Sequence, residues 1–297
     1  MAERGILEVE TPVLSRGAPL DPGVESWRAV APGGASGYLQ TSPEYPMKRL
    51  LADGAGDLYQ LARVFRGDEQ GHRHNPEFSL LEWYRVGFDD RRLMEELLEL
   101  VRRVATADPD WVRPRDAVRR LSYAELFRNG LGLDPLSSSV EDCARAAESQ
   151  GLSVAGDLDV DGWLDALVSL VLAPRFDPGQ LTLIHDYPES QAVLARPSRD
   201  APGYASRFEL YWGDMELANG FHELTDPLVF AARRERDVER RRRNGQPIPE
   251  ADGFFAAAMQ AGLPDCAGVA LGVDRLLMRL LGVADIAEVI DFPWGRA

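Results

Sequence analysis

The first of three separated segments that could do chemistry spans residues 65–84. Arg66 ends a predicted strand, a polar loop follows, and a second predicted strand returns over 77–86. A guanidinium at a strand end can pair its fork with a phosphate. Alternate residues of a strand share one face, which would here offer an aromatic surface beside a carboxylate and a phenol: Phe78, Leu80, Glu82 and Tyr84. Such a face suits a planar base and an ammonium group. It also suits an ordinary hairpin with a core face and a structural Arg–Glu pair.

The second segment places two carboxylates, Glu216 and Glu223, along one predicted strand. Hard cations take oxygen ligands, so the pair suits a Mg²⁺–phosphate site. Their odd separation would put them on opposite faces of a regular strand. We therefore predict a bulge or kink around Asn219–Gly220 that turns both into one site. A half-exposed edge strand with solvated acids is the alternative.

The third segment has small residues at every second position, Gly268, Ala270 and Gly272, followed by Arg275. Small residues clear one face of a strand for a ligand or for another backbone. Arg275 lies at a predicted strand-to-helix junction, where anions often bind. Glycines in a packed strand would give the same pattern.

The basic run from Arg233 to Arg243 superficially resembles a nucleic-acid patch. Acidic residues are interleaved in it, so a solvated helix face is the preferred interpretation. The four histidines are scattered without a zinc-ligand spacing.

The elements that must position these segments alternate in blocks of strands, helices and strands. Strands are predicted over 6–13, 38–41, 58–66, 77–86, 181–185, 208–212, 215–224 and 268–272, and helices over 89–106, 122–130, 141–150 and 163–172, with others opening at Ser42 and Asp274. This order favours an α+β fold with an antiparallel sheet flanked by helices. We predict one domain over 1–297 with a helical insertion at about 107–178.

The composition is that of a globular protein with a strong negative charge. Acidic residues outnumber basic ones by 48 to 33, giving a formal charge of −15. Nucleic acid is therefore a poor default partner, and a basic protein surface is better matched. Two cysteines and the lack of a signal peptide or a membrane span predict a cytoplasmic protein.

Taken in order, these segments resemble the three signature motifs of class II aminoacyl-tRNA synthetases, in the lysyl branch. Residues 5–12 resemble motif 1, residues 65–84 resemble motif 2 with the lysyl-type string Arg-His-Asn-Pro-Glu-Phe, and 216–223 with 268–275 resemble the metal-binding strand and motif 3. Within that branch the strings at 41–45, 47–51, 81–84 and 216–224 are most similar to the elongation factor P–lysine ligases. We expect no anticodon-binding barrel, and hence no tRNA substrate.

The resemblance implies roles for individual residues. Arg66 would contact the α-phosphate and the substrate carboxylate, and Arg275 the γ-phosphate, as catalytic residues. ATP would also be held by Asp68, His74, Asn75, Phe78, Leu217 and Gly272. Glu216 and Glu223 would hold Mg²⁺–ATP, with Glu223 also meeting the amino-acid ammonium. The amino-acid pocket would be lined by Ser42, Glu44, Glu82, Tyr84 and Ala270.

The implied reaction joins lysine or (R)-β-lysine to AMP and then to a lysine side chain of elongation factor P. A homodimer is also implied, although only a stub of the motif 1 helix precedes residue 5. Asp68 replaces the usual Glu of motif 2, and Ala270 replaces the middle glycine of motif 3, which fits the ligase branch. Lysyl-tRNA synthetase activity and a non-catalytic amino-acid-binding paralogue are the two alternatives.

Overall fold

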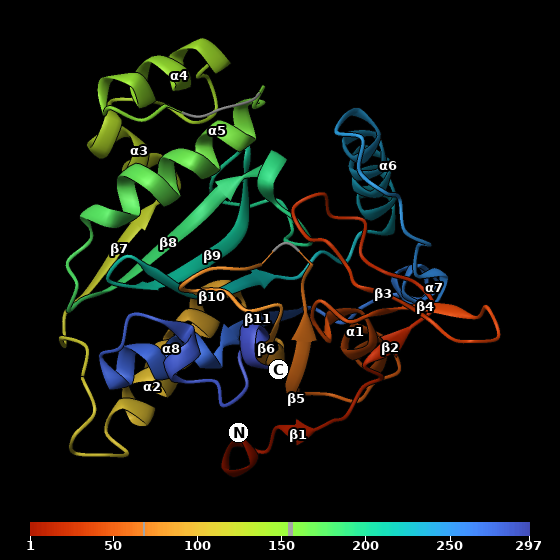
Figure 1. Cartoon of the computed structure of the whole chain (residues 1–297). Coiled ribbons are helices and arrows are strands. Elements are labelled where there is room, and N and C mark those ends of the chain that lie inside the picture. The colour runs from red at the N-terminus through yellow and green to blue at the C-terminus, as the bar shows by residue number, and fades with distance from the viewer. Residues whose placement is uncertain (68, 154–156) are drawn as a thin grey trace. The chain divides into compact units, whose positions relative to one another are not determined.

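The computed structural model describes residues 1–67, 69–153 and 157–297, which form two compact units (Figure 1). The first unit comprises Met1–Leu93 and His222–Ala297, and the second comprises Met94–Phe221. Asp68, a predicted ATP-binding residue, lies outside the described residues. The expectation of a single domain over 1–297 stays a prediction.

The first unit is built on a sheet whose strands run in the order β1-β5-β6-β11. Their bounds are Leu7–Glu8, Leu58–Phe65, Glu77–Val86 and Cys266–Gly272. β1 is parallel to β5, whereas β5–β6 and β6–β11 are antiparallel. Burial alternates along β5, as expected for a strand with one covered face.

A small second sheet in the first unit was only partly predicted. It has the order β2-β4-β3, with bounds Leu14–Ser15, Ser36–Leu39 and Arg28–Val30. Four further helices belong to this unit: α1 (Glu44–Ala52), α6 (Pro227–Arg243), α7 (Gly253–Ala261) and α8 (Val273–Leu281). α1 packs on α7 through the stacked rings of Tyr45 and Phe255, 4.1 Å apart.

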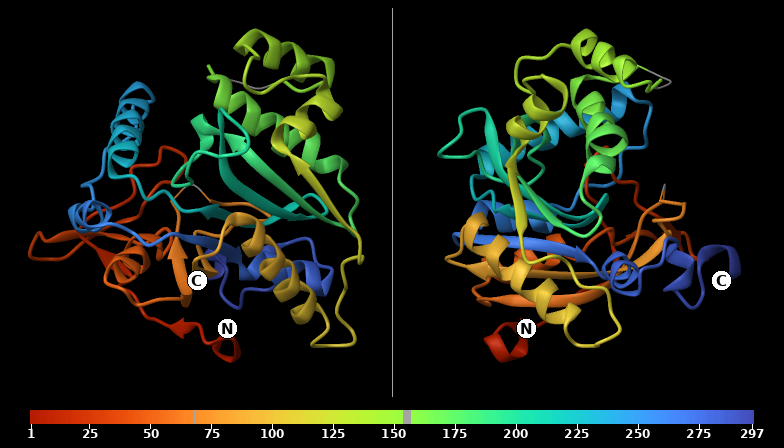
Figure 2. Two further views of the ribbon diagram at one scale, coloured as in Figure 1. Left: turned by 180° about the vertical axis from the view of Figure 1, so that it is seen from behind. Right: turned by 90° about the vertical axis from the view of Figure 1, so that its left-hand side faces the viewer.

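The second unit holds strands in the order β10-β9-β8-β7. Their bounds are Met215–His222, Tyr204–Trp212, Leu181–Pro188 and Val118–Ser122. Helices α3 (Tyr123–Leu131), α4 (Val140–Ser149) and α5 (Val160–Leu167) lie to one side of β7, β8 and β9 (Figures 1 and 2). α2 (Asp90–Ala105) begins in the first unit and continues into the second.

Local sequence signals account for several element boundaries. A capping box begins α3, with the Ser122 side chain accepting from the Glu125 backbone N–H. The structure begins α1 at Glu44 rather than at Pro43, but the Ser42 hydroxyl still accepts from the Glu44 N–H at 3.0 Å. Gly54 follows the end of α1 with a positive φ, a conformation that glycine adopts readily at this position after a helix.

The α+β class and the antiparallel pairing of most strands are confirmed. The region predicted as a helical insertion also contains strand β7, which pairs in parallel with β8. The predicted bulge around Asn219–Gly220 is wrong in position, because the pairing of β10 with β9 shifts between Glu216 and Ala218 and is regular through Gly220. Gly220 is instead required because a Cβ there would lie 2.3 Å from the Phe208 ring.

In the part of the chain that the structure describes, none of the helices has the length and apolar character needed to cross a bilayer.

Candidate active site

Strands β6 and β11 bring two of the predicted segments onto one face of the first unit's sheet. Directly paired residues share a face, and the register pairs Gly268 with Tyr84, Ala270 with Glu82, and Gly272 with Leu80. The small residues of β11 therefore lie beside the carboxylate and phenol of β6. The spacing of the small residues did not predict this partner; only the family resemblance placed Ala270 with Glu82 and Tyr84.

The Glu82 carboxylate is held at both oxygens. Ser42 Oγ donates to its Oε2 at 2.7 Å, and the Tyr84 hydroxyl donates to its Oε1 at 2.6 Å. Glu82 is only 2% exposed. Burial, reinforced by the charge of Glu44, raises the pKa of Glu82 to about 7, against the opposing hydrogen bonds from Tyr84 and Ser42. This carboxyl group therefore titrates near neutral pH.

Lys48 is a buried cation between two other acids. Its Nζ lies 2.6 Å from Glu44 Oε1 and 2.6 Å from Glu223 Oε2, and Lys48 and Glu223 each have a side chain 1% exposed. Burial alone would lower the pKa of Lys48, but the Glu223 and Glu44 carboxylates outweigh burial and raise it. Burial also raises the pKa of Glu223 to about 8, despite the Lys48 ammonium.

We call Glu44, Glu82, Glu223 and Lys48 the carboxylate pocket. Gly268 is necessary to its shape, because a Cβ at this position would lie 2.3 Å from the Tyr84 ring and 2.5 Å from Glu223 Oε1. The absence of a side chain at Gly268 thus makes room for the Tyr84 ring and the Glu223 carboxylate, while the expected approach of a ligand or of another backbone stays a prediction. The pocket sets three carboxyl groups against one ammonium, so it can accept further positive charge.

Arg66 and Arg275 both lie close to His74. Arg275 Nη2 is 2.7 Å from His74 Nε2. Burial lowers the pKa of His74, and the charge of Arg275 lowers it further, against the opposing charge of Glu69; both lowering effects favour the neutral ring. Arg66 also lies over the Phe78 ring, 5.1 Å from its centroid. Two guanidinium groups and an aromatic face therefore meet around the loop that joins β5 to β6.

Four hydrogen bonds fix this loop and its neighbours. Arg66 donates from Nη1 to Glu69 Oε1 at 2.9 Å. The Ser79 N–H donates to Asp274 Oδ2 at 2.6 Å, which ties β6 to the start of α8 directly after Gly272. The Asn75 amide donates to Glu77 O, and its Oδ1 accepts from the Trp294 N–H at 2.9 Å. Asn75 therefore anchors the C-terminal segment around Trp294.

Two further predicted residues, Glu216 and Leu217, lie in the second unit. Glu216 is half-buried at the register shift of β10, and Leu217 is 2% exposed within the same strand. Glu223 follows the end of β10 and belongs to the first unit. Their roles toward a metal and ATP stay predictions. Over residues 1–67, 69–153 and 157–297, no group of three or more His, Cys, Asp or Glu side chains is arranged to hold a metal ion.

Sequence reasoning assigned no role to Lys48, although a local signal existed. Lys48 is the only lysine among 297 residues and lies one helical turn after Glu44. An isolated lysine in an arginine-rich chain, spaced to pair with a predicted pocket acid, could have marked it as part of the site. Its contact with Glu223, far along the chain, had no such signal.

Comparison with known proteins extends over the whole chain. A family model for class II tRNA synthetases (D, K and N) matches residues 1–296. A protein of Vibrio cholerae named elongation factor P–(R)-β-lysine ligase is 44% identical, with all of this chain and 91% of that protein covered. Proteins of the same name from Yersinia enterocolitica and Salmonella paratyphi B are 43% and 44% identical, with the same coverage.

Both kinds of match reach from end to end and agree with the motif 2 and motif 3 geometry described above. The chain therefore belongs to the class II tRNA synthetases and, within them, to the family of the elongation factor P–(R)-β-lysine ligases.

Proposed function

We propose that this protein activates lysine or (R)-β-lysine with ATP and transfers the aminoacyl group to a lysine side chain of elongation factor P. The observation that carries the proposal is the carboxylate pocket, which lies on the same sheet as the Arg66 and Phe78 surface. When all three carboxyl groups are ionised, they leave a deficit of two positive charges beside the single Lys48 ammonium. The two ammonium groups of a diamino acid match that deficit.

The pocket residues have distinct tasks toward the amino acid. Glu82, oriented by Ser42 and Tyr84, is placed to accept a hydrogen bond from one substrate ammonium. Lys48 holds Glu223 and Glu44 in place, and these two side chains supply negative charge for the second ammonium group of the substrate. Ala270, opposite Glu82 in the register, would bound the space beside the reacting end of the substrate.

In the first step the substrate carboxylate attacks the α-phosphorus of ATP. A carboxylate–phosphorus bond forms, the bond from that phosphorus to the bridging oxygen breaks, and pyrophosphate leaves. The attacking group is already ionised, so no general base is needed. We assign Arg66 to the α-phosphate and Arg275 to the γ-phosphate, where they would stabilise the developing charge. Phe78 and His74 would hold the adenine side of ATP, together with Asn75, Gly272 and Asp68.

In the second step the ε-amine of the acceptor lysine attacks the adenylate carbonyl. A carbon–nitrogen bond forms, the carbon–oxygen bond to AMP breaks, and the amine loses a proton. The acceptor must therefore react as a neutral amine. Because its ordinary pKa is about 10.4, this step needs local desolvation or a group that accepts the proton.

Mg²⁺ is the cation expected with ATP, since carboxylates suit it. Glu223, however, is occupied by the Lys48 ammonium at 2.6 Å, so its carboxylate does not fit a metal in this arrangement. We route no step through Mg²⁺. Glu216 remains the predicted ligand that this contact does not involve.

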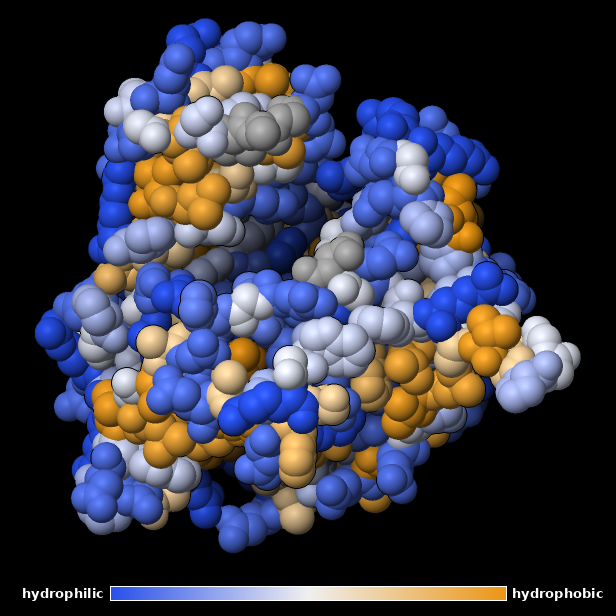
Figure 3. All heavy atoms as spheres, viewed as in Figure 1, coloured by the Kyte–Doolittle hydropathy of each residue, from blue (hydrophilic) through white to orange (hydrophobic). Residues whose placement is uncertain are grey.

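We further propose that the protein is a cytoplasmic homodimer that does not act on tRNA. Apolar residues show on the surface around α1, β2 and β4 (Figure 3). Leu7 of the motif 1 segment and Leu14 of β2 are 53% and 54% exposed. Exposed apolar side chains on short edge strands suit a self-complementary interface. The free thiols of Cys143 and Cys266 fit a reducing compartment.

Amino-acid-dependent exchange of pyrophosphate into ATP tests the activation step. We expect exchange with lysine or (R)-β-lysine and none with norleucine, which has the same chain length but lacks the side-chain ammonium. Exchange with neither diamino acid would overturn the proposal. Charging of lysine-specific tRNA at physiological salt would favour the synthetase alternative.

A further inference from the structure

The basic run of α6 differs from its predicted solvated state at two positions, because Arg233 and Arg241 are both buried. Arg241 is 1% exposed, whereas the neighbouring Arg242 side chain is 63% exposed. The prediction of a solvated helix face is therefore wrong at Arg233 and at Arg241, of which Arg241 is the more deeply buried. Burial of an arginine is costly unless every donor is satisfied, so the surroundings of this side chain need an explanation.

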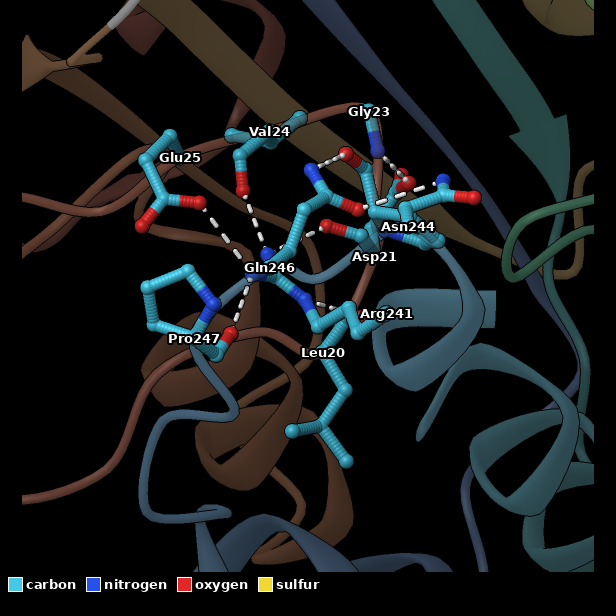
Figure 4. A network of polar contacts seen from close by, with 10 residues as sticks. Leu20, Asp21, Gly23, Val24, Glu25, Arg241, Asn244, Gln246 and Pro247 are labelled. Carbon is cyan, nitrogen blue, oxygen red and sulfur yellow. Dashed lines mark hydrogen bonds and ion pairs between the residues drawn. The ribbon is translucent and has the colours of Figure 1, made fainter. Parts of the chain in front are cut away.

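The Arg241 guanidinium makes five hydrogen bonds, and four of them bind residues 20–25 (Figure 4). Nε donates to Leu20 O at 2.9 Å, and Nη2 donates to Asp21 O at 2.7 Å and to Val24 O at 2.8 Å. Nη1 donates to the Glu25 carboxylate at 3.1 Å. Its other bond goes to Pro247 O at 2.8 Å, just beyond α6.

This pattern matches the full donor set of one guanidinium. Four of the five acceptors are backbone carbonyls, and the fifth is the Glu25 carboxylate, so Arg241 fixes the conformation of the backbone rather than mainly pairing with charged side chains. Gln246 also binds the segment of residues 20–25, since its Nε2 donates to Pro22 O at 2.9 Å. The end of α6 and the turn after it thus hold residues 20–25 in one conformation.

Residues 20–25 in turn touch the backbone that carries Arg66. Glu25 O accepts a hydrogen bond from the Gly67 N–H at 2.9 Å. A Cβ built on Gly67 would lie 3.4 Å from Glu25 Cγ, so the two residues are in van der Waals contact. Glu25 is therefore bonded at both ends: its carboxylate to Arg241, and its carbonyl to the residue that follows Arg66.

We propose that Arg241 is a positioning residue for the nucleotide, acting through Glu25 and Gly67 on the direction in which Arg66 points. The inference rests on the proposed function insofar as Arg66 binds the α-phosphate of ATP. Arg241 itself touches no substrate. Its effect belongs to ATP binding and phosphoryl transfer, and not to the amino-acid pocket.

Arg241→Lys tests this directly, because it keeps the charge but replaces five planar donors by three on a flexible stem. We expect ATP affinity, measured by calorimetry without amino acid, to weaken by about tenfold, as for loss of one well-oriented charged contact. The KM for lysine in pyrophosphate exchange should change by less than about twofold. Arg242→Lys, one residue further along α6, should leave both quantities unchanged.

Glu25→Gln provides a second, milder variant, since it keeps the carbonyl that binds Gly67 and loses only the ion pair. We expect ATP affinity to weaken here too, and the double variant Arg241→Lys/Glu25→Gln to cost less than the two single effects combined, because both act on one path. Thermal unfolding measured alongside separates positioning from stability.

The proposal is overturned if Arg241→Lys lowers the melting temperature but leaves ATP affinity intact, or if ATP and lysine constants change equally. Strictly additive effects of the two substitutions would also overturn it. ATP binding is measured without turnover, so these results stay readable even if the unchanged protein exchanges no pyrophosphate with lysine. That last result would refute the proposed function alone.

Discussion

Replacing Lys48 by methionine should cost the protein stability in a way that grows with pH. The substitution keeps the length of the side chain and removes the ammonium that lies 2.6 Å from both Glu44 and Glu223. Glu223 is 1% exposed and would be left as a buried charge without its ammonium partner. Breaking a buried ion pair by removing one partner costs about 3–5 kcal/mol.

The variant can recover part of this free energy by protonating Glu223. Its pKa, already raised to about 8 by burial, rises further once Lys48 is gone. The folded state then binds more protons than the unfolded state at every pH between the ordinary glutamate pKa and the raised one. Over that window the free energy of unfolding falls as pH rises, by at most about 1.4 kcal/mol per pH unit for each proton.

Urea unfolding at about pH 7 and about pH 9 measures this dependence, because Glu223 of the unchanged protein, with its pKa of about 8, loses its proton within that interval whereas Glu223 of the variant keeps it. The difference in unfolding free energy between the unchanged protein and Lys48→Met should be larger at the higher pH. Arg49→Met is a matched control on the same helix, because Arg49 lies over the exposed Phe254 ring, 5.0 Å from its centroid. Its cost should not depend on pH. A Lys48→Met cost that is equal at both pH values would refute the assignment of Lys48 as the partner of buried acids.

Three further predictions concern the pocket and the loop. The pKa values of Glu82 and Glu223 are raised to about 7 and about 8, so both side chains gain negative charge as pH rises. The KM for lysine in pyrophosphate exchange should therefore fall from about pH 6 to about pH 8.5, and a flat profile at saturating ATP would contradict this. Gly268→Ala forces a methyl group against Tyr84 and Glu223 and should raise the KM for lysine by at least about tenfold while the circular dichroism spectrum stays unchanged. An unaltered KM would show that the amino-acid pocket lies elsewhere. Asn75→Ala removes the acceptor of the Trp294 N–H and should speed hydrogen exchange over residues 293–296, whereas equal exchange rates would mean that other contacts hold this segment.

Much of the sheet in the first unit could be predicted because its strands carry their pattern locally. β6 has the predicted bounds, since Phe78, Leu80, Glu82 and Tyr84 alternate with residues of the other face. Small residues in β11 indicated a face with little side-chain bulk, although their spacing did not predict that Tyr84 lies against Gly268. Family resemblance then supplied roles that no periodicity could give.

The errors share a physical cause, which is that they depend on residues distant in the sequence. A bulge at any position between Glu216 and Glu223 would turn the two side chains to the same face of the strand, so their spacing could not locate the bulge. Gly220 instead leaves room for the Phe208 ring. Interleaved acids indicated a solvated α6, but residues 20–25, more than two hundred positions earlier, bury Arg241. Lys48 had a visible partner in Glu44 and a hidden one in Glu223.

Intact mass of elongation factor P, after incubation with this protein, ATP and (R)-β-lysine, tests the central claim most directly. The account predicts a gain of one lysyl residue that requires ATP, disappears when the acceptor lysine is replaced by arginine, and is abolished by Arg66→Ala. An unmodified elongation factor P with both lysine and (R)-β-lysine, under conditions where the acceptor is intact, would contradict it.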